Sequence, residues 1–294
     1  MHRKIKKAVL PVGGMGTRFL PATKALPKEM LPIINKPLIQ YAFEEAVNAG
    51  IEEFIFITGR NKNIIINHFD CVYELEKVLN DNDKQSALAL TRDWVPEPGK
   101  IAFIRQQHPL GLGHAVWCAR HFIQDEPFAV LLADELFLST RSTSLLSEMT
   151  AAYDKNPGNI IAVADVAPEQ THRYGIVEAN DDDGLTMKIT NMVEKPAPGE
   201  APSNISIIGR YILQPEIFDY LERTPKGRGE EIQLTDAMKS MLKEFPFYGY
   251  RFNGKRLDCG TPLGFLEANL EMSLADESLA NDAKKIIKNI ASRL

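Results

Sequence analysis

Short apolar runs and amphipathic stretches alternate along the first 166 residues of the chain. Two stretches have the 3.6-residue spacing of helices, and a glycine ends the first of them at Gly50. Five apolar runs have the length and composition of strands: 7–14, 52–59, 101–106, 127–135 and 160–166. The helical stretches lie between them, over 37–50 and 111–123. Strands that alternate with helices predict a mostly parallel sheet that is covered on both faces.

The pattern changes after residue 166. Apolar and polar residues alternate over 174–196 on both sides of a DDDG turn, which predicts a β-hairpin with a solvated acidic turn. A further strand is predicted over 206–213, and helices over 231–245 and after Pro262. The last segment, 278–294, has the pattern of an amphipathic helix that packs on the body or on a second subunit. We therefore expect one α/β domain, a Rossmann-like three-layer fold with a mixed, mostly parallel sheet and a small β-rich portion that begins near residue 167.

Composition and charge narrow the class of protein. The chain has 294 residues, of which 44% are hydrophobic and 25% charged, and its formal net charge of −5 gives no overall basic field for nucleic acid. The three cysteines are too far apart for a metal motif, which predicts free thiols in a reducing compartment. The apolar run near the N-terminus is too short for a signal peptide or a membrane span. These features predict a cytoplasmic protein without a membrane or nucleic-acid partner.

The stretch GGMGTRFLPATKALPKEM, residues 13–30, follows the first predicted strand. In a parallel α/β sheet ligands bind at the carboxyl ends of the strands, so this loop is placed at a ligand site. Its glycines let backbone N–H groups approach a phosphate, and Arg18 and Lys28 add positive charge. The dinucleotide fingerprint fails because Phe19 stands at its third glycine, and no Walker lysine follows. The loop therefore favours a polyphosphate ligand over a nicotinamide dinucleotide.

Several motifs in order resemble the sugar-1-phosphate nucleotidylyltransferases. The first loop matches the pattern G-x-G-T-R followed by K-[EQ]-[ML]-[LM]-P, and the wording LPATKALPKEMLP (20–32) is similar to the uridylyl branch of that family. Further stretches carry the resemblance across nearly the whole chain: GLGHAV, ADEL, YGIV, VEKP, GRYIL, GEEIQLTDA and LDCG. The resemblance implies a Mg²⁺-dependent enzyme that transfers UMP from UTP to glucose 1-phosphate, giving UDP-glucose and pyrophosphate. The same reaction with dTTP and a non-catalytic relative that binds nucleotide-sugars both stay open at this point.

The resemblance also implies roles for particular residues. It implies one nucleotidyltransferase domain over residues 1–294. Within this domain, 1–166 is the nucleotide-binding portion, 167–277 is the sugar-binding portion, and 278–294 is a C-terminal helix. The residues with catalytic roles are Arg18 and Lys28, which act on the departing pyrophosphate, and Lys195, which acts on the incoming phosphate. The nucleotide-binding residues are Val12, Gly13, Gly14, Gly16, Thr17, Glu29, Gln106 and Gly111. The sugar-binding residues are Gly175, Glu194, Lys195 and Glu231, and the Mg²⁺ ligands are Asp134 and Asp258.

Three further points depend on single residues or on the family as a whole. Glu231 either contacts the sugar or caps the helix that follows it. Glu135 receives no role, and His114 is interpreted as a packed helix histidine rather than a catalyst. The resemblance implies a homodimer or a homotetramer, with UTP and glucose 1-phosphate as the small-molecule partners.

Overall fold

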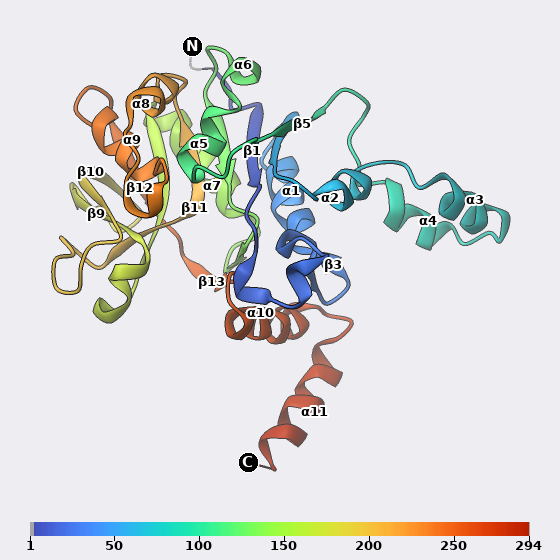
Figure 1. Ribbon diagram of the computed structural model, residues 1–294. Helices are drawn as coiled ribbons and strands as arrows, with labels where there is room; N and C mark the ends of the chain where they lie inside the picture. Colours follow the sequence, from blue (N-terminus) through green and yellow to red (C-terminus); the bar gives the residue numbers. More distant parts are fainter. Residues whose placement is uncertain (1–2, 294) are drawn as a thin grey trace.

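The computed structural model describes residues 3–293 and contains one large mixed sheet (Figure 1). Its nine strands are, in spatial order, β5 (Ile101–Arg105), β4 (Glu53–Thr58), β1 (Lys7–Val12), β6 (Phe128–Leu131), β11 (Ile205–Leu213), β8 (Asn159–Asp165), β12 (Phe247–Arg251), β10 (Thr186–Glu194) and β9 (Gly175–Asn180). Two small sheets pair β2 (Pro32–Ile33) with β3 (Lys36–Pro37) and β7 (Glu135–Ser139) with β13 (Gly254–Asp258). All the strands expected from the sequence are present, so the α/β class is confirmed.

The expectation of a mostly parallel sheet is not confirmed. Strands β5, β4, β1 and β6 run parallel, and so do β8 and β12. Strand β11 runs antiparallel to both β6 and β8, and β10 runs antiparallel to both β12 and β9. The sheet is therefore mixed, because β11 and the hairpin bring two reversed strands into it.

Helices cover both faces of the sheet. Alternate residues of one strand point to opposite faces, and in β1 the side chains of Ala8 and Leu10 enter one apolar cluster while Val9 enters the other. The first cluster includes residues of α1 (Leu38–Asn48), α2 (Asn63–His68) and α7 (Leu145–Lys155), and the second includes residues of α5 (Leu112–Trp117), α6 (Arg120–Ile123), α8 (Ile217–Arg223) and α9 (Leu234–Met241). The expected helix over 111–123 is interrupted between α5 and α6.

A third, smaller apolar cluster joins distant parts of the sequence. It contains Ile33 from β2, Leu136 from β7, Leu257 from β13 and Ala268 from α10 (Pro262–Ala275). Figure 1 shows α10 lying across the end of the molecule beside β13. This cluster fixes the segment around Asp258 against the loop that follows β1.

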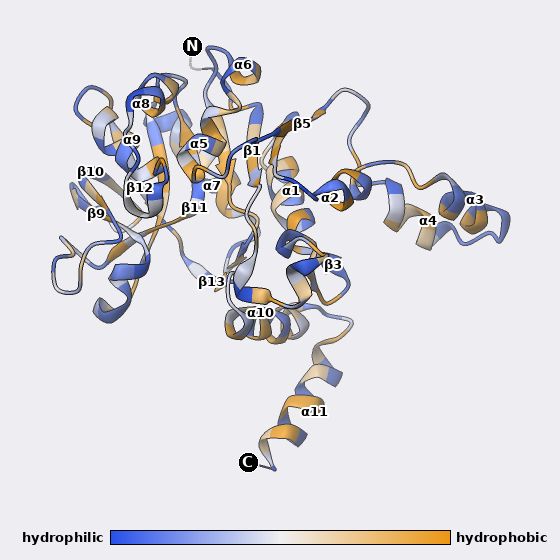
Figure 2. Cartoon of the chain, viewed as in Figure 1, coloured by the Kyte–Doolittle hydropathy of each residue, from blue (hydrophilic) through white to orange (hydrophobic). Residues whose placement is uncertain are grey.

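Two helical segments extend away from the body (Figure 1). One is the pair α3 (Tyr73–Asp81) and α4 (Gln85–Arg92); the other is α11 (Ala280–Ala291), the observed part of the helix expected over 278–294. Figure 2 shows hydrophobic residues on α11, where Ile286 and Ile290 are 60% and 48% exposed. Among the helices of residues 3–293, none has the length and apolar character needed to cross a membrane.

Candidate active site

The loop after β1 is compact and held by its own backbone. It contains three short 3₁₀ turns, η1 (Thr17–Phe19), η2 (Ala22–Lys24) and η3 (Lys28–Met30). Gly16 has a φ of 66°, and a methyl group placed on it would lie 3.2 Å from Thr23 Cγ2. The Thr23 hydroxyl donates a 2.7 Å hydrogen bond to the Gly16 carbonyl. Glycine is therefore required at position 16, where the chain must turn back so that Lys28 lies beside the start of the loop.

Side chains from both ends of the chain meet beside this loop. Lys28 Nζ lies 2.6 Å from Asp134 Oδ2, and Arg18 Nη1 donates to the Gly260 carbonyl at 3.4 Å. A methyl group placed on Gly260 would lie 3.0 Å from Asp258 Oδ1, 3.4 Å from Asp134 Oδ2 and 3.5 Å from Arg18 Nη1. The structure thus brings together the four residues Arg18, Lys28, Asp134 and Asp258, which we call the charged cluster.

Lys28 and Asp134 are both ionised in this cluster. Burial by itself favours the neutral form of each, but the Lys28 charge and hydrogen bond outweigh it and lower the pKa of Asp134. The pKa of Lys28 is raised, because the charges of Asp134 and Glu29 outweigh the burial that would lower it. The neighbouring Cys259 behaves differently: burial, with the carboxylates of Asp134 and Asp258, raises the pKa of its thiol to about 12. The cluster therefore presents fixed charges beside a neutral thiol.

The carboxylates of Asp134 and Asp258 are the residues that would hold a divalent cation. Over the described residues, no three His, Cys, Asp or Glu side chains gather in a way that could hold a metal ion. Asp258 Oδ1 accepts from the Gly260 N–H at 2.9 Å, and Asp258 Oδ2 lies 3.4 Å from Arg173 Nη2. Mg²⁺ typically takes one or two protein carboxylates and completes its shell with waters and substrate phosphates. The oxygen donors present fit such an ion, and the metal role of the two residues stays a prediction.

The predicted base-binding residues Gln106 and Gly111 follow β5, and Gln106 lies beside Gly13 at the start of the glycine loop. Gln106 follows β5, its N–H donates to the Thr58 carbonyl at 2.8 Å, and its Oε1 would lie 3.1 Å from a methyl group on Gly13. Gly111 has a φ of 94°, and a methyl group there would lie 2.7 Å from Glu231 Cβ. Because β1, β4 and β5 are parallel, Gly13 and Gln106 reach the same edge of the sheet. Gly13, Gln106, Gly111 and Glu231 therefore form one contiguous group.

The remaining predicted nucleotide-binding residues have different exposures. Gly14 is exposed, and a methyl group on it would meet only Lys28 Cε, at 3.8 Å. Thr17 is exposed in η1, whereas Val12 is fully buried at the end of β1, in the first apolar cluster. Glu29 is 1% exposed, and its carboxylate is paired with Lys62 at 2.8 Å. A direct contact of Glu29 with a nucleotide requires this buried pair to open, and its binding role stays a prediction.

Three of the predicted sugar-binding residues, Gly175, Glu194 and Lys195, meet at the end of β10. The strand ends at Glu194, and Lys195 has a left-handed φ of 45°, which turns its side chain toward that of Glu194 at 2.9 Å between Nζ and Oε1. Glu194 Oε2 also accepts from the Thr235 hydroxyl at 2.8 Å and would lie 3.2 Å from a methyl group on Gly175. Adjacent residues of a regular strand point to opposite faces, so the end of the strand is what lets Glu194 and Lys195 lie together.

Glu231 does not cap the helix that follows it. Helix α9 begins at Leu234, and the residue before it is Gln233, whose amide donates to Glu231 Oε2 at 3.2 Å. Glu231 instead lies against Gly111, one of the predicted base-binding residues. Of the two alternatives for Glu231, the helix cap is wrong, and the sugar contact stays a prediction.

Sequence reasoning missed several residues that support the site. Arg256 holds Glu135 through two hydrogen bonds, of 2.7 and 2.9 Å, and its guanidinium carbon lies 4.7 Å from the centre of the Tyr174 ring. Glu135 also accepts from the Gly209 N–H at 3.2 Å, so it is a structural partner rather than a ligand. Thr235, described above, is also one of these residues. No local pattern marks these pairs, because their members are 40 or more residues apart in sequence.

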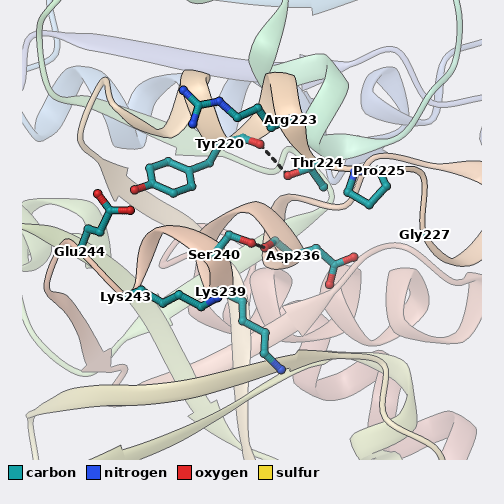
Figure 3. A pocket seen from close by; sticks show the side chains of 10 residues that line it. All are labelled: Tyr220, Arg223, Thr224, Pro225, Gly227, Asp236, Lys239, Ser240, Lys243 and Glu244. Atoms are coloured by element: carbon teal, nitrogen blue, oxygen red, sulfur yellow. Dashed lines mark hydrogen bonds between the residues drawn. The ribbon is translucent and has the colours of Figure 1, made fainter.

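A separate groove lies between α8 and α9 (Figure 3). None of the predicted site residues lines it, although the lining residue Asp236 has a raised pKa through burial and the nearby charge of Glu194. Figure 3 shows the side chains of Arg223 and Lys239 pointing in different directions, so they do not converge on one ligand position. The groove is not part of the candidate active site.

Comparisons with known proteins identify the family of the chain. The family model "Nucleotidyl transferase" matches residues 7–274. The UTP–glucose-1-phosphate uridylyltransferase of Bacillus subtilis (strain 168) is 46% identical over 291 residues, which cover 99% of each chain, and that of Staphylococcus haemolyticus is 46% identical over 288 residues. A UTP-bound UGPase from Acinetobacter baumannii superposes with a TM-score of 0.89 at 42% identity, covering 96% of this chain and 98% of that one. A UDP-glucose pyrophosphorylase complexed with UDP-glucose gives a TM-score of 0.85 at 43% identity, covering 92% and 100%.

Proposed function

The chain belongs to the nucleotidyl transferase family, and we propose that it transfers the UMP group of UTP to glucose 1-phosphate, releasing pyrophosphate. It is a nucleotidyltransferase of the UTP–glucose-1-phosphate uridylyltransferase type, as are its relatives at 46% identity over nearly the full chain. The single structural observation that carries the proposal is the charged cluster at the glycine loop. A reaction between two anions needs this concentration of fixed charge.

The reaction joins a phosphate oxygen of glucose 1-phosphate to the α-phosphorus of UTP. The bond between the α-phosphorus and the oxygen bridging to the β-phosphate breaks, and pyrophosphate leaves with that oxygen. The attacking phosphate is already ionised at neutral pH, so no general base is required. The protein therefore accelerates the reaction through positioning and charge neutralisation.

Each group of residues has a part in this scheme. Arg18 and Lys28, with the backbone N–H groups of the glycine loop, neutralise charge on the departing pyrophosphate. Lys195 binds the incoming phosphate, and its ion pair with Glu194 holds it beside the carboxylate that accepts from a sugar hydroxyl. Gln106 and Gly111 bind the base.

A divalent cation completes the proposed site. We propose Mg²⁺, held by Asp134 and Asp258. When bound, it would withdraw charge from the phosphate oxygens of UTP. Lys28 Nζ lies 2.6 Å from Asp134 Oδ2, and its charge offsets that of the carboxylate. The chain's own lysine thus keeps the carboxylate ionised and oriented.

Other properties also belong to the proposal. Residues 1–166 form the nucleotide-binding portion and 167–277 the sugar-binding portion of one domain. The protein acts in the cytoplasm as a homodimer or homotetramer. The sequence and the family resemblance support these properties.

A pyrophosphate-release assay tests the proposed function. UTP, dTTP, CTP, ATP and GTP are each combined with glucose 1-phosphate, galactose 1-phosphate or mannose 1-phosphate at fixed Mg²⁺, and phosphate is measured after pyrophosphatase treatment. We expect the highest rate with UTP and glucose 1-phosphate. A faster reaction with dTTP would favour the thymidylyl alternative. Binding of UDP-glucose without any pyrophosphate release would favour a non-catalytic regulator.

A further inference from the structure

The side-chain amide of Gln106 is held in one orientation. Its Nε2 lies 3.0 Å from the Gly111 carbonyl oxygen and 3.0 Å from His114 Nδ1. A carbonyl oxygen can only accept a hydrogen bond, so the amide group that faces Gly111 must be the NH₂. The second hydrogen of this NH₂ then points to His114, whose Nδ1 must accept it. His114 is therefore neutral, with its proton on Nε2.

This orientation leaves the Gln106 carbonyl oxygen to face the ligand side. Oε1 points toward Gly13, where even a methyl group would lie only 3.1 Å away. Both amide hydrogens are used within the protein, so Gln106 can offer an incoming base only an acceptor. Uracil presents a donor, N3–H, whereas N3 of cytosine is itself an acceptor. An acceptor opposite N3 favours uracil, and it repels the lone pair of cytosine.

We propose that His114 is a positioning residue that locks the Gln106 amide and thereby makes the site select uracil over cytosine. The proposal rests on the proposed function, in which Gln106 contacts the base. His114 itself need not touch the nucleotide, because it acts through the Gln106 amide. The selection extends to any base with an N3–H group, thymine included.

The surroundings of His114 keep its ring neutral near pH 7. Burial lowers the pKa of His114 below its usual value, and the neighbouring His108 and Arg120 act in the same direction. The ring stacks on Trp117 with centroids 5.7 Å apart, and the Arg120 guanidinium carbon lies 3.4 Å from the Trp117 ring centre. Cys118 Sγ lies 4.0 Å from His114 Nδ1, and the carboxylate-bearing Glu231 packs against Gly111, three residues before His114. The cations oppose protonation of the His114 ring, whereas the Glu231 carboxylate would favour it.

Protonation of His114 would break the lock. A proton on Nδ1 would face the amide NH₂, placing two donors opposite each other. If the amide turned over to relieve this, its oxygen would face the Gly111 carbonyl, placing two acceptors opposite each other. Neither orientation satisfies both partners. The preference for uracil should therefore weaken as the pH falls through the titration of His114.

The test compares UTP and CTP in two variants of His114. His114→Leu removes the acceptor, and His114→Asn keeps one, because an asparagine oxygen occupies nearly the position of a histidine Nδ1. For each protein, kcat and KM for pyrophosphate release are measured with UTP and CTP between pH 5.5 and 8. Binding of both nucleotides is measured by calorimetry, and circular dichroism checks folding. His108→Leu, an exposed neighbour, is the matched control.

We expect His114→Leu to lower the UTP-to-CTP ratio of kcat/KM about tenfold or more at pH 7.5, mainly through a higher KM for UTP. The difference from wild type should shrink toward pH 5.5, where the wild type loses the same acceptor by protonation. His114→Asn should keep the ratio and lose its pH dependence. His108→Leu should keep the wild-type ratio at pH 7.5. An unchanged ratio in His114→Leu would overturn the proposal, and so would an equal loss in His114→Asn, since packing and not the acceptor would then matter.

A spectroscopic measurement separates this proposal from the proposed function. Long-range ¹H–¹⁵N correlation spectra report which nitrogen of His114 carries the proton, with no nucleotide present. We expect an unprotonated Nδ1 near pH 7, and a protonated Nδ1 would overturn the lock. If the wild type binds UTP in preference to CTP but releases no pyrophosphate, the proposed function fails and the lock stands.

Discussion

The buried pair between Glu29 and Lys62 gives a prediction whose size can be worked out from the structure. The two side chains are 2% and 8% exposed, and their charged atoms are 2.8 Å apart. Burial raises the pKa of Glu29 even though Lys62 and Lys28 both act to lower it. We consider the substitution Lys62→Met, which keeps most of the apolar stem and removes the charge. Breaking a buried pair in this way typically costs about 3–5 kcal/mol of folding free energy.

The folded protein can limit this cost by protonating Glu29. Holding a carboxyl group neutral costs about 1.4 kcal/mol for each pH unit above its unfolded pKa, which is 4.5 for Glu29. At pH 7 this route limits the loss to about 3 kcal/mol, and at pH 5 to less than about 1 kcal/mol. A raised pKa means that the folded state binds more protons than the unfolded state. The stability of Lys62→Met must therefore fall, relative to wild type, as the pH rises above 4.5.

Urea unfolding followed by circular dichroism at pH 5, 6, 7 and 8 measures this difference. The double variant Glu29→Gln with Lys62→Met is the control, because it removes both charges and should recover most of the stability and lose the pH dependence. A loss in Lys62→Met that is equal at pH 5 and pH 8 would refute the electrostatic reasoning. It would show instead that the lysine stem stabilises the fold by packing.

Three further predictions concern the active site. Asp134→Asn should slow pyrophosphate release by about two to three orders of magnitude and raise the Mg²⁺ concentration needed for half-maximal rate. The control Asp154→Asn, at an exposed position on α7, should change neither. Normal Mg²⁺ dependence in Asp134→Asn would argue against a metal role for Asp134. Gly260→Ala places a methyl group 3.0 Å from Asp258 Oδ1. The rate of pyrophosphate release should therefore fall about tenfold or more, while the urea midpoint of unfolding stays unchanged. Full activity would mean that the charged cluster tolerates a displacement of Asp258. Glu135→Gln should lower the free energy of unfolding by about 2–4 kcal/mol, because it leaves the largely buried Arg256 guanidinium, whose side chain is 14% exposed, without its paired charge. Urea unfolding measures this, and an unchanged stability would contradict the structural role of Glu135.

Sequence periodicity predicted the elements well and their directions less well. The strands from β1 to β11 that carry strong apolar runs were all placed, because a short apolar run, or an alternation of apolar and polar residues, marks a strand wherever it lies. Neither pattern says anything of strand direction, so the reversed β11 between β6 and β8 was not foreseen. The helices α3 and α4 were not predicted either, and most of their residues are exposed.

The charged cluster was predicted and its supporting pairs were not. Arg18, Lys28, Asp134 and Asp258 each stand in a recognisable motif, so a resemblance sufficed to group them. Arg256 and Glu135 are separated by 121 residues, and Lys62 and Glu29 by 33. Their partners are chosen by the tertiary fold, and a single sequence carries no local sign of such a choice.

The contact between Arg18 and Gly260 spans 242 residues of the chain. A polypeptide still emerging from the ribosome can complete β1 and its glycine loop long before Asp258 and α10 exist. Contacts of such long range also form late in refolding, because the chain entropy of closing the loop must be overcome first. After dilution from urea, the recovery of enzyme turnover should therefore report the last step of folding. It should lag behind the recovery of the helical circular dichroism signal.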